Sequence, residues 1–323
     1  MAVDPIYGLP KYPVLDHIAE WTKTRYLRAY RKMLTIRVYE DALAECIRQK
    51  RIPETCHLYA GQEAVAVGVS EALNKDDLVF GTYRSHGYYI ARGGDLRRMT
   101  DEIFQRENSS GRRGSMHVYD SEVGILGSSA ILGGSVGLAL GAATAEKLKD
   151  SGRVVVGFHG DGASEEGIWY EACNIAALKG LPLILVCENN LYGTQVPISK
   201  RRPSPFIAPI AKSLGMYSLT IDGNSLSDVY FAARRAVKLA LNGQPVFIEA
   251  LTWRKYGHYG PGRDIGDRMR QQSEDMMWAL RDPIEHFRKF LVQQDIATDV
   301  ELDDIAEWVR KEVRNVIGDD AIC

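Results

Sequence analysis

The middle of the chain alternates between short apolar runs and segments with helical periodicity, and this alternation restricts the fold more than any other feature. Residues 153–158 (RVVVGF) and 183–187 (LILVC) are typical of buried strands, and residues 168–178 between them have apolar positions at helical spacing. Gly180 and Pro182 mark where that helix is expected to end. A strand, a helix and a second strand in this order predict a βαβ unit with parallel strands.

The same order occurs again nearer the C-terminus. Residues 217–221 (YSLTI) and 246–251 (VFIEAL) read as strands on either side of a helix over 228–241. Repeated βαβ units predict the α/β class, with a doubly wound parallel sheet covered by helices on both faces.

Helical segments are expected at both ends of the chain. Residues 15–50 have apolar positions at three- and four-residue steps, and from residue 282 the chain is charged and helical in pattern. The length suits one large α/β domain. We therefore predict a single domain over residues 1–323, with an N-terminal helical layer over 1–55 and a C-terminal helical tail over 282–323.

Composition argues against several classes of function. The chain has 40 basic and 42 acidic residues, a formal net charge of -2, so no overall field favours nucleic acid or an anionic membrane. No apolar run reaches the ~18 residues of a membrane span, and the N-terminal residues lack the pattern of a targeting segment. The absence of GxGxxG, and of GxxxxGK followed by Ser or Thr, disfavours a nicotinamide or P-loop enzyme. The five cysteines are widely spaced without a CxxC pair, so we expect free thiols and a cytoplasmic location.

Polar residues follow the ends of two neighbouring predicted strands. Asp161 follows the first strand and Asn190 follows the next. Because the carboxyl ends of parallel strands meet at one edge of a sheet, where open α/β sheets bind ligands, the two side chains should lie close together. Carboxylate and amide oxygens suit Mg²⁺, which also keeps phosphate oxygens and water as ligands. Gly160 and Gly162 allow a diphosphate to approach the backbone and the start of the following helix, so the segment predicts a metal–diphosphate site.

The segment from residue 160 to 193, GDGASEEGIWYEACNIAALKGLPLILVCENNLYG, resembles the GDG…NN signature of thiamine-diphosphate enzymes. Its ENNLYG ending is similar to the α subunits of pyruvate and branched-chain 2-oxoacid dehydrogenases. Two earlier blocks, CHLYAGQEAVAVG and GTYRSHGYYIARG, extend the resemblance, which runs from about residue 27 to residue 290. The resemblance implies the thiamine-diphosphate-binding fold, with Mg²⁺ held by the side chains of Asp161 and Asn190 and the backbone carbonyl of Tyr192.

The resemblance also implies contacts to thiamine diphosphate. Tyr83 and Arg84 are expected at the diphosphate, where the planar guanidinium can make two charge-assisted hydrogen bonds. Gly124 is expected to contact the aminopyrimidine through its backbone, and Leu126 to hold the cofactor in its bent conformation. The complete expected cofactor-binding set is Tyr83, Arg84, Gly124, Leu126, Gly160, Asp161, Gly162, Ala163, Asn190, Tyr192 and His258.

Histidines supply the expected catalytic residues. By the resemblance, His57 lines the active site and His258 lies at the diphosphate and the reacting centre, where both can move protons. His86 is expected either to contact the site directly or to act through a neighbouring group, and His117 to order a loop. Tyr259 stands where mitochondrial relatives carry a regulatory serine, so no phosphorylation switch is expected at that position.

The chain lacks one part of a thiamine-dependent active site. The aminopyrimidine needs a carboxylate partner, which in two-gene relatives comes from a β subunit, and no glutamate here can be assigned that role. The resemblance therefore implies an α2β2 heterotetramer. The implied reaction is oxidative decarboxylation of a small 2-oxo acid, with acyl transfer to lipoyl-lysine on an acyltransferase component.

Two other functions remain open at this point. Relatives often carry Gln and Pro where this chain has Ser129 and Ile131, so a thiamine-diphosphate-dependent carboligase or synthase not coupled to a lipoyl complex is an alternative. A non-catalytic scaffold of the same fold is a second alternative. The presence of Asp161 and Asn190 argues against the scaffold, because it would have no need of metal ligands.

Overall fold

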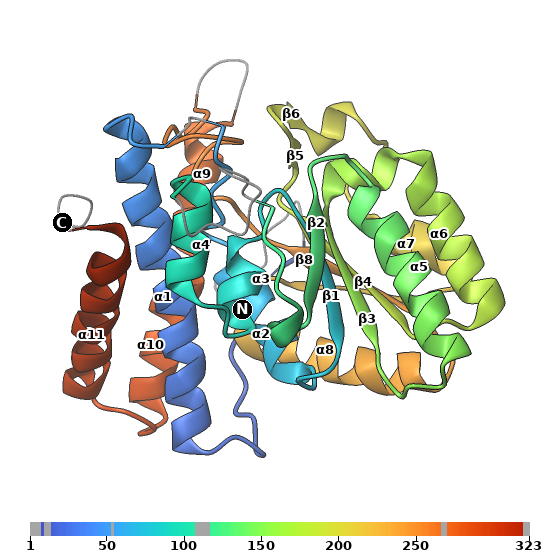
Figure 1. The fold of residues 1–323 in the computed structure, drawn as a ribbon, viewed down its shortest axis with the longest axis horizontal. Helices are drawn as coiled ribbons and strands as arrows, with labels where there is room; N and C mark the ends of the chain where they lie inside the picture. Colours follow the sequence, from blue (N-terminus) through green and yellow to red (C-terminus); the bar gives the residue numbers. More distant parts are fainter. Residues whose placement is uncertain (1–7, 10–13, 53–54, 107–116, 266–269, 319–323) are drawn as a thin grey trace.

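A six-stranded parallel sheet forms the centre of the computed structural model, which describes residues 8–9, 14–52, 55–106, 117–265 and 270–318. The strand order is β2-β1-β3-β4-β8-β7, and every neighbouring pair is parallel (Figure 1). The strands are β1 (Leu78–Thr82), β2 (Ile125–Ser129), β3 (Val155–Gly160), β4 (Leu183–Asn189), β7 (Tyr217–Asp222) and β8 (Val246–Leu251). The predicted doubly wound α/β fold is thus confirmed.

One face of the sheet is covered by α5 (Gly134–Leu148), α6 (Gly167–Lys179) and α7 (Ala208–Ser213). Alternate strand residues point to opposite faces, and β4 shows the division. Leu183 and Leu185 pack in the cluster beneath these three helices, whereas Ile184 and Val186 pack in the cluster on the other face. A strand that is buried on both faces explains why β4 is a continuous apolar run in the sequence.

The other face packs against α2 (Glu63–Ala72), α3 (His86–Ala91) and α8 (Leu226–Leu241). The α2 and α8 helices approach closely at Gly68, where a Cβ atom would lie 2.7 Å from Cγ1 of Val229. Beyond them lies a second helical layer, on the far side of the molecule from α5 and α6 in Figure 1. It consists of α1 (Lys23–Arg48), α4 (Leu96–Ile103), α10 (Pro283–Gln293) and α11 (Asp299–Ile317).

The helical ends of the chain pack against each other. The α1 helix begins at Lys23, later than the periodicity suggested, because the Thr22 hydroxyl accepts the Arg25 N–H as an N-cap. Buried residues of α1 and α11 belong to the same apolar cluster as one face of the sheet. The division of the chain at residues 55 and 282 stays a prediction.

The smaller elements include a short hairpin of β5 (Tyr192–Gly193) and β6 (Val196–Pro197), and the helix α9 (Gln272–Ala279). Within the described parts of the chain, no helix combines the length and apolar character that crossing a bilayer requires.

Candidate active site

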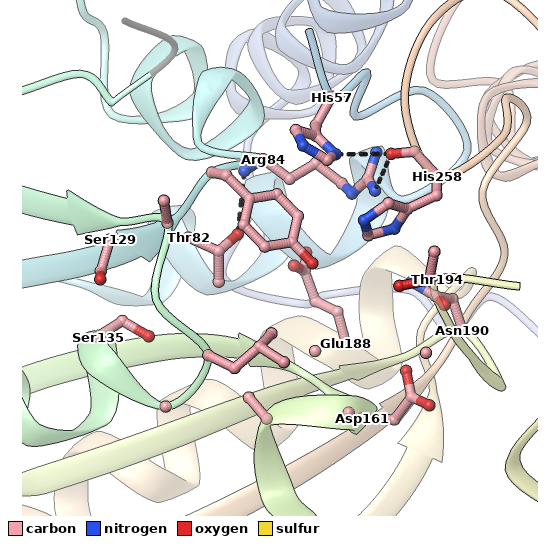
Figure 2. A pocket seen from close by; sticks show the side chains of 18 of the residues that line it. His57, Thr82, Arg84, Ser129, Ser135, Asp161, Glu188, Asn190, Thr194 and His258 are labelled. Carbon is pink, nitrogen blue, oxygen red and sulfur yellow. Dashed lines mark hydrogen bonds between the residues drawn. The ribbon is translucent and has the colours of Figure 1, made fainter. Parts of the chain in front are cut away.

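A cavity of about 550 Å³ lies at the carboxyl ends of the strands. Five strands lead into it, each followed by residues that line the wall (Figure 2). These residues are 82–84 after β1, 129–133 after β2, 160–163 after β3, Asn190 and 192–194 after β4, and Arg254 and His258 after β8. His57, Gln62 and His117 also line the cavity. The sheet edge predicted from the order of strands is therefore where the cavity lies.

Most of the residues predicted to act together meet in this cavity. The lining includes His57, Tyr83, Arg84, Gly160, Asp161, Gly162, Ala163, Asn190, Tyr192 and His258. The chain after Asp161 forms a 3₁₀ turn over Asp161–Glu165, and α6 begins only at Gly167. The backbone nearest to Asp161 is therefore a tight turn, not the first turn of the helix that the sequence predicted.

Gly124 and Leu126 are not among the residues that line this cavity, so their contacts with the cofactor stay predictions. They precede and begin β2, whereas the cavity lies beyond its end. Gly124 has φ 77°, and a Cβ atom there would lie 2.5 Å from the Asp77 carbonyl oxygen. Leu126 packs against the cluster beneath α5.

A stretch just beyond Leu126 lines the cavity. AILG (130–133) follows the end of β2, and Ala130, Ile131, Leu132 and Gly133 all line the wall.

Asn190 presents an oxygen atom without a partner. Its side-chain Nδ2 donates to Oε1 of Gln62 at 3.0 Å, which fixes the orientation of the amide. Its Oδ1 is buried and has no hydrogen-bond partner among the described residues. A buried acceptor in this condition is costly unless a ligand satisfies it.

Asp161 lies beside a positive charge. Its carboxylate accepts a hydrogen bond from the guanidinium of Arg201. Burial raises the pKa of Asp161, while Arg201 acts in the opposite direction. The phenol of Tyr192 donates to Glu274 on α9 at 2.7 Å. Among the described residues no three His, Cys, Asp or Glu side chains gather as a metal site, so a metal here would need the amide oxygen of Asn190 as well as Asp161. Asn190 and Asp161 both fit a hard divalent cation. The amide oxygen of Asn190 lacks a partner, and the carboxylate of Asp161 already neutralises the charge of Arg201.

Arg254 is a lining residue that the sequence analysis missed. It is 2% exposed, and its Nη2 donates to the Thr194 carbonyl at 3.1 Å. Its Nη1 has no hydrogen-bond partner among the described residues. Burial, followed by the positive charges of Arg84 and Arg270, lowers the pKa of Arg254 to about 9. A buried cation with a spare donor on the cavity wall indicates an anionic ligand.

The histidines form one cluster at the cavity wall. Nδ1 of His57 lies 2.7 Å from the His258 carbonyl, and the two ring centroids are 4.8 Å apart. The Arg84 guanidinium donates to the same carbonyl at 2.9 Å, so both hydrogen bonds converge on it in Figure 2. Because a carbonyl only accepts, Nδ1 of His57 carries the proton and Nε2 is the basic nitrogen.

Both rings are neutral near pH 7. Burial, and then the charge of Arg84, lowers the pKa of His57 to about 4 and that of His258 to about 3. His57 can therefore accept a proton at Nε2 without first losing one.

Residues 30–319 match the model of the dehydrogenase E1 component family. The chain belongs to that family. The α subunit of the acetoin:2,6-dichlorophenolindophenol oxidoreductase of Bacillus subtilis is 38% identical over 303 residues, which are 92% of this chain and 89% of that protein. The pyruvate dehydrogenase E1 component α subunit of Rhizobium meliloti is 36% identical over 310 residues, 94% of this chain and 86% of that protein. The mitochondrial α-2 subunit of the same component in Arabidopsis thaliana is 37% identical over 302 residues, 93% and 76% respectively.

These similarities confirm the predicted family, the α subunits of thiamine-diphosphate-dependent 2-oxoacid dehydrogenases. Membership in the E1 family implies thiamine diphosphate as the cofactor and a β subunit as the partner. The carboligase alternative is not favoured.

This E1 α-type chain has a further acidic residue in the cavity wall. The buried carboxylate of Glu188 accepts hydrogen bonds from the hydroxyls of Tyr59 and Tyr88. Burial raises the pKa of Glu188 to about 7, although the two tyrosines act against the shift. Glu188 lies in the ENNLYG stretch, whereas Tyr59 and Tyr88, which donate to it, are far away in the sequence.

The remaining predicted histidine and tyrosine positions are also described. His86 is not in the lining; its Nδ1 lies 2.8 Å from Oε1 of Glu40, and both side chains are fully buried. Tyr259 is about half exposed beside the histidine cluster.

Proposed function

We propose that this chain is the α subunit of a 2-oxoacid dehydrogenase that decarboxylates a small 2-oxo acid oxidatively and transfers the acyl group to lipoyl-lysine of an acyltransferase. The observation that carries the proposal is the pairing, in one cavity, of an Asn190 oxygen without a partner and an Arg254 donor without a partner. The first suits a metal ion and the second an anion, and a metal–diphosphate pair satisfies both.

Asp161, Asn190 and the backbone of Tyr192 would hold Mg²⁺. Arg254, Arg84 and the backbone of residues 160–163 would hold the diphosphate. When bound, thiamine diphosphate supplies the electron sink for decarboxylation. The neutral His57 and His258 would take up and return protons at the reacting centre.

The apolar residues after β2 would meet the rings of the cofactor. Ile131 is 75% exposed and Leu132 is 47% exposed, although both are large apolar side chains in the cavity wall. A cofactor and a second subunit would together remove this surface from water.

The β subunit would cover the exposed apolar face of α5 and α6. This face begins at the cavity, where a Cβ atom on Gly133 would lie 2.5 Å from Cγ2 of Ile168. It continues over Leu138, Ile175 and Leu178, all exposed. Such a position would let the partner close the cavity and supply the missing carboxylate. Two copies of each chain, α2β2, are the proposed assembly.

We also propose a cytoplasmic location. The described cysteines, Cys46, Cys56, Cys173 and Cys187, are buried free thiols, as expected in a reducing compartment. Cell fractionation with an antibody against the chain tests this location, and recovery in a membrane or organellar fraction would contradict it.

Calorimetric titration with thiamine diphosphate and Mg²⁺ tests the main proposal. The chain is used alone and co-expressed with a β subunit, each with an Asp161→Ala counterpart. Tight magnesium-dependent binding by the pair, lost in the variant, is expected. Binding that needs no Mg²⁺, or that survives Asp161→Ala, would refute the metal–diphosphate site. Acylation of a free lipoyl domain with pyruvate or acetoin then tests the acyl acceptor, and a carboligase would leave the lipoyl group unmodified.

A further inference from the structure

The guanidinium of Arg201 lies against the carboxylate of Asp161, where a metal ion bound to that carboxylate would lie. One terminal nitrogen of its guanidinium donates to Oδ2 of Asp161 and the other to Oε1 of Glu165. Its Nε donates to the Val196 carbonyl at 3.1 Å, so all three nitrogens are engaged. The Arg201 side chain is 12% exposed. The ion pair of Arg201 with Asp161 is therefore a largely buried contact in the cavity wall, held by further hydrogen bonds.

The neighbouring residue strengthens the same attachment. Arg202 donates to the Ser164 hydroxyl at 2.9 Å and to Glu165 at 3.3 Å. The two arginines fasten residues 191–202, which we call the latch loop, to the 3₁₀ turn Asp161–Glu165. The guanidinium of Arg201 also lies over Gly193, where a Cβ atom would be 3.2 Å from its central carbon.

The latch loop is held in an unfavourable backbone conformation. Leu191 has φ 70° and Thr194 has φ 55°, in the left-handed region that residues other than glycine rarely adopt. The loop also carries Tyr192 and the Thr194 carbonyl that accepts a hydrogen bond from Arg254. A contact that fastens this loop therefore acts on the proposed metal end and the proposed diphosphate end of the cavity together.

A guanidinium and a divalent cation cannot share the same buried carboxylate oxygen without strong repulsion. Arg201 has a second acidic partner in Glu165, whose side chain is partly exposed. It can therefore leave Asp161 and keep one ion pair.

We propose that Arg201 is an internal counter-cation that occupies the position of the metal at Asp161 and must leave it when Mg²⁺ binds. This inference rests on the proposed magnesium site. Metal binding then releases one fastening of the latch loop, and the metal-free protein keeps its buried carboxylate neutralised. The apparent affinity for Mg²⁺ is the intrinsic affinity multiplied by the fraction of molecules in which Arg201 has left Asp161.

The test is a series of calorimetric titrations of the αβ complex with thiamine diphosphate at increasing Mg²⁺ concentrations, in the absence of substrate, which gives the apparent affinity for Mg²⁺. Arg201→Gln should bind Mg²⁺ at least about tenfold more tightly than the wild type. Lys200→Gln is the matched control, because it removes the same charge from an exposed neighbouring side chain. It should leave the affinity unchanged. An unchanged or weaker affinity in Arg201→Gln would overturn the proposal; a weaker one would mean that Arg201 holds the cofactor itself.

Hydrogen exchange supplies a readout that does not depend on affinity. Amides of the latch loop should exchange faster in metal-free Arg201→Gln than in metal-free wild type, because the variant lacks one fastening of the loop. Equal exchange in the two metal-free proteins would contradict the latch. If Arg201→Gln does not fold, Arg201→Lys, which keeps the charge on a different head group, should show an intermediate gain in affinity, and no gain would overturn the proposal. Asp161→Ala separates the role proposed for Arg201 from the proposed magnesium site. If Mg²⁺ binding survives Asp161→Ala, the magnesium site itself is wrong.

Discussion

Arg254 is a buried cation whose Nη2 donates to a neutral group, the Thr194 carbonyl. Its Nη1 has no hydrogen-bond partner among the described residues, and burial, with the charges of Arg84 and Arg270, lowers its pKa to about 9. A residue in this condition lowers the stability of the protein and raises its affinity for a ligand. Binding and folding should therefore respond to its removal in opposite directions.

Arg254→Gln should weaken the binding of thiamine diphosphate by at least about tenfold, because one charge-assisted contact is lost. The same change should not lower the melting temperature of the cofactor-free protein, since it removes an unfavourable buried charge. Calorimetric titration and thermal unfolding measure the two effects. Arg281→Gln is the contrasting variant: Arg281 pairs with the buried Asp222, so its loss should destabilise the protein. A loss of stability in Arg254→Gln equal to that in Arg281→Gln would show a structural role instead.

The sequence could identify site residues that directly follow a strand, because strand order places them at one edge. Asp161 and Asn190 are of this kind. It could not identify Glu188 or Arg201, whose contacts depend on how separate loops fold together.

At the scale of elements, one buried carboxylate joins α1 to α2. Glu71 accepts hydrogen bonds from Arg25, Arg28 and Lys32 at 3.1, 2.8 and 2.9 Å. Burial alone would raise the pKa of Glu71, but Lys32 and Arg28 outweigh it and lower the pKa from 4.5 to about 2. A lowered pKa in the folded state means that the ionised form stabilises the fold.

Glu71→Gln should therefore lower the free energy of unfolding by about 2 kcal/mol at pH 7, allowing for screening of the partly exposed cations. The stabilisation by Glu71 is complete above its unfolded-state pKa of 4.5 and is lost as the pH falls towards about 2. The gap between wild type and variant should be constant from pH 7 to 5 and should shrink below pH 4.5. Urea denaturation at several pH values measures it. A gap that widens on acidification would contradict this assignment.

Two helical glycines should respond to the same substitution with opposite signs. Gly68 of α2 is buried, and a Cβ atom there would lie 2.7 Å from Val229 of α8, so Gly68→Ala should cost about 1–3 kcal/mol of stability. Gly141 of α5 has nothing within 4 Å of a built Cβ atom. Gly141→Ala should stabilise the chain by about 0.5–1 kcal/mol, because alanine loses less backbone entropy in a helix. Denaturation of the two variants gives both values, and equal signs would contradict the packing described for α2 and α8.

Sequence periodicity located four strands of the sheet but not the two at its β2 end. The strands β3, β4, β7 and β8 lie where apolar runs predicted them; β3, β4 and β8 are buried parallel strands with few polar residues. The strands β1 (LVFGT) and β2 (ILGSS) were not predicted, since they are short and contain glycine or serine. Their existence depends on pairing with β3 and with each other, which a local pattern does not contain.

At the scale of the whole molecule, the two sides of the sheet differ in how fully they are covered. One side carries α2 and α8 and, beyond them, the layer of α1, α10 and α11, whereas the other ends at α5, α6 and α7 (Figure 1). Exposed apolar residues on α5 and α6 continue from the cavity wall. A face of this kind is expected to be covered in an assembly, and its position would put the covering subunit beside the proposed cofactor site.

A Leu138→Lys, Leu178→Lys double variant should therefore fold but fail to form the complex with the β subunit, because two desolvated charges would oppose the contact. Val300→Lys on α11 is the matched control: Val300 is 70% exposed, close to the 74% of Leu178, but lies in the opposite helical layer. Sedimentation of co-expressed chains should show the heterotetramer for the wild type and the control. The double variant should give free α chains with an unchanged melting temperature. Recovery of the full complex from the double variant would place the β subunit on another face, and the carboxylate that completes the active site would then have to reach the cavity from a different direction.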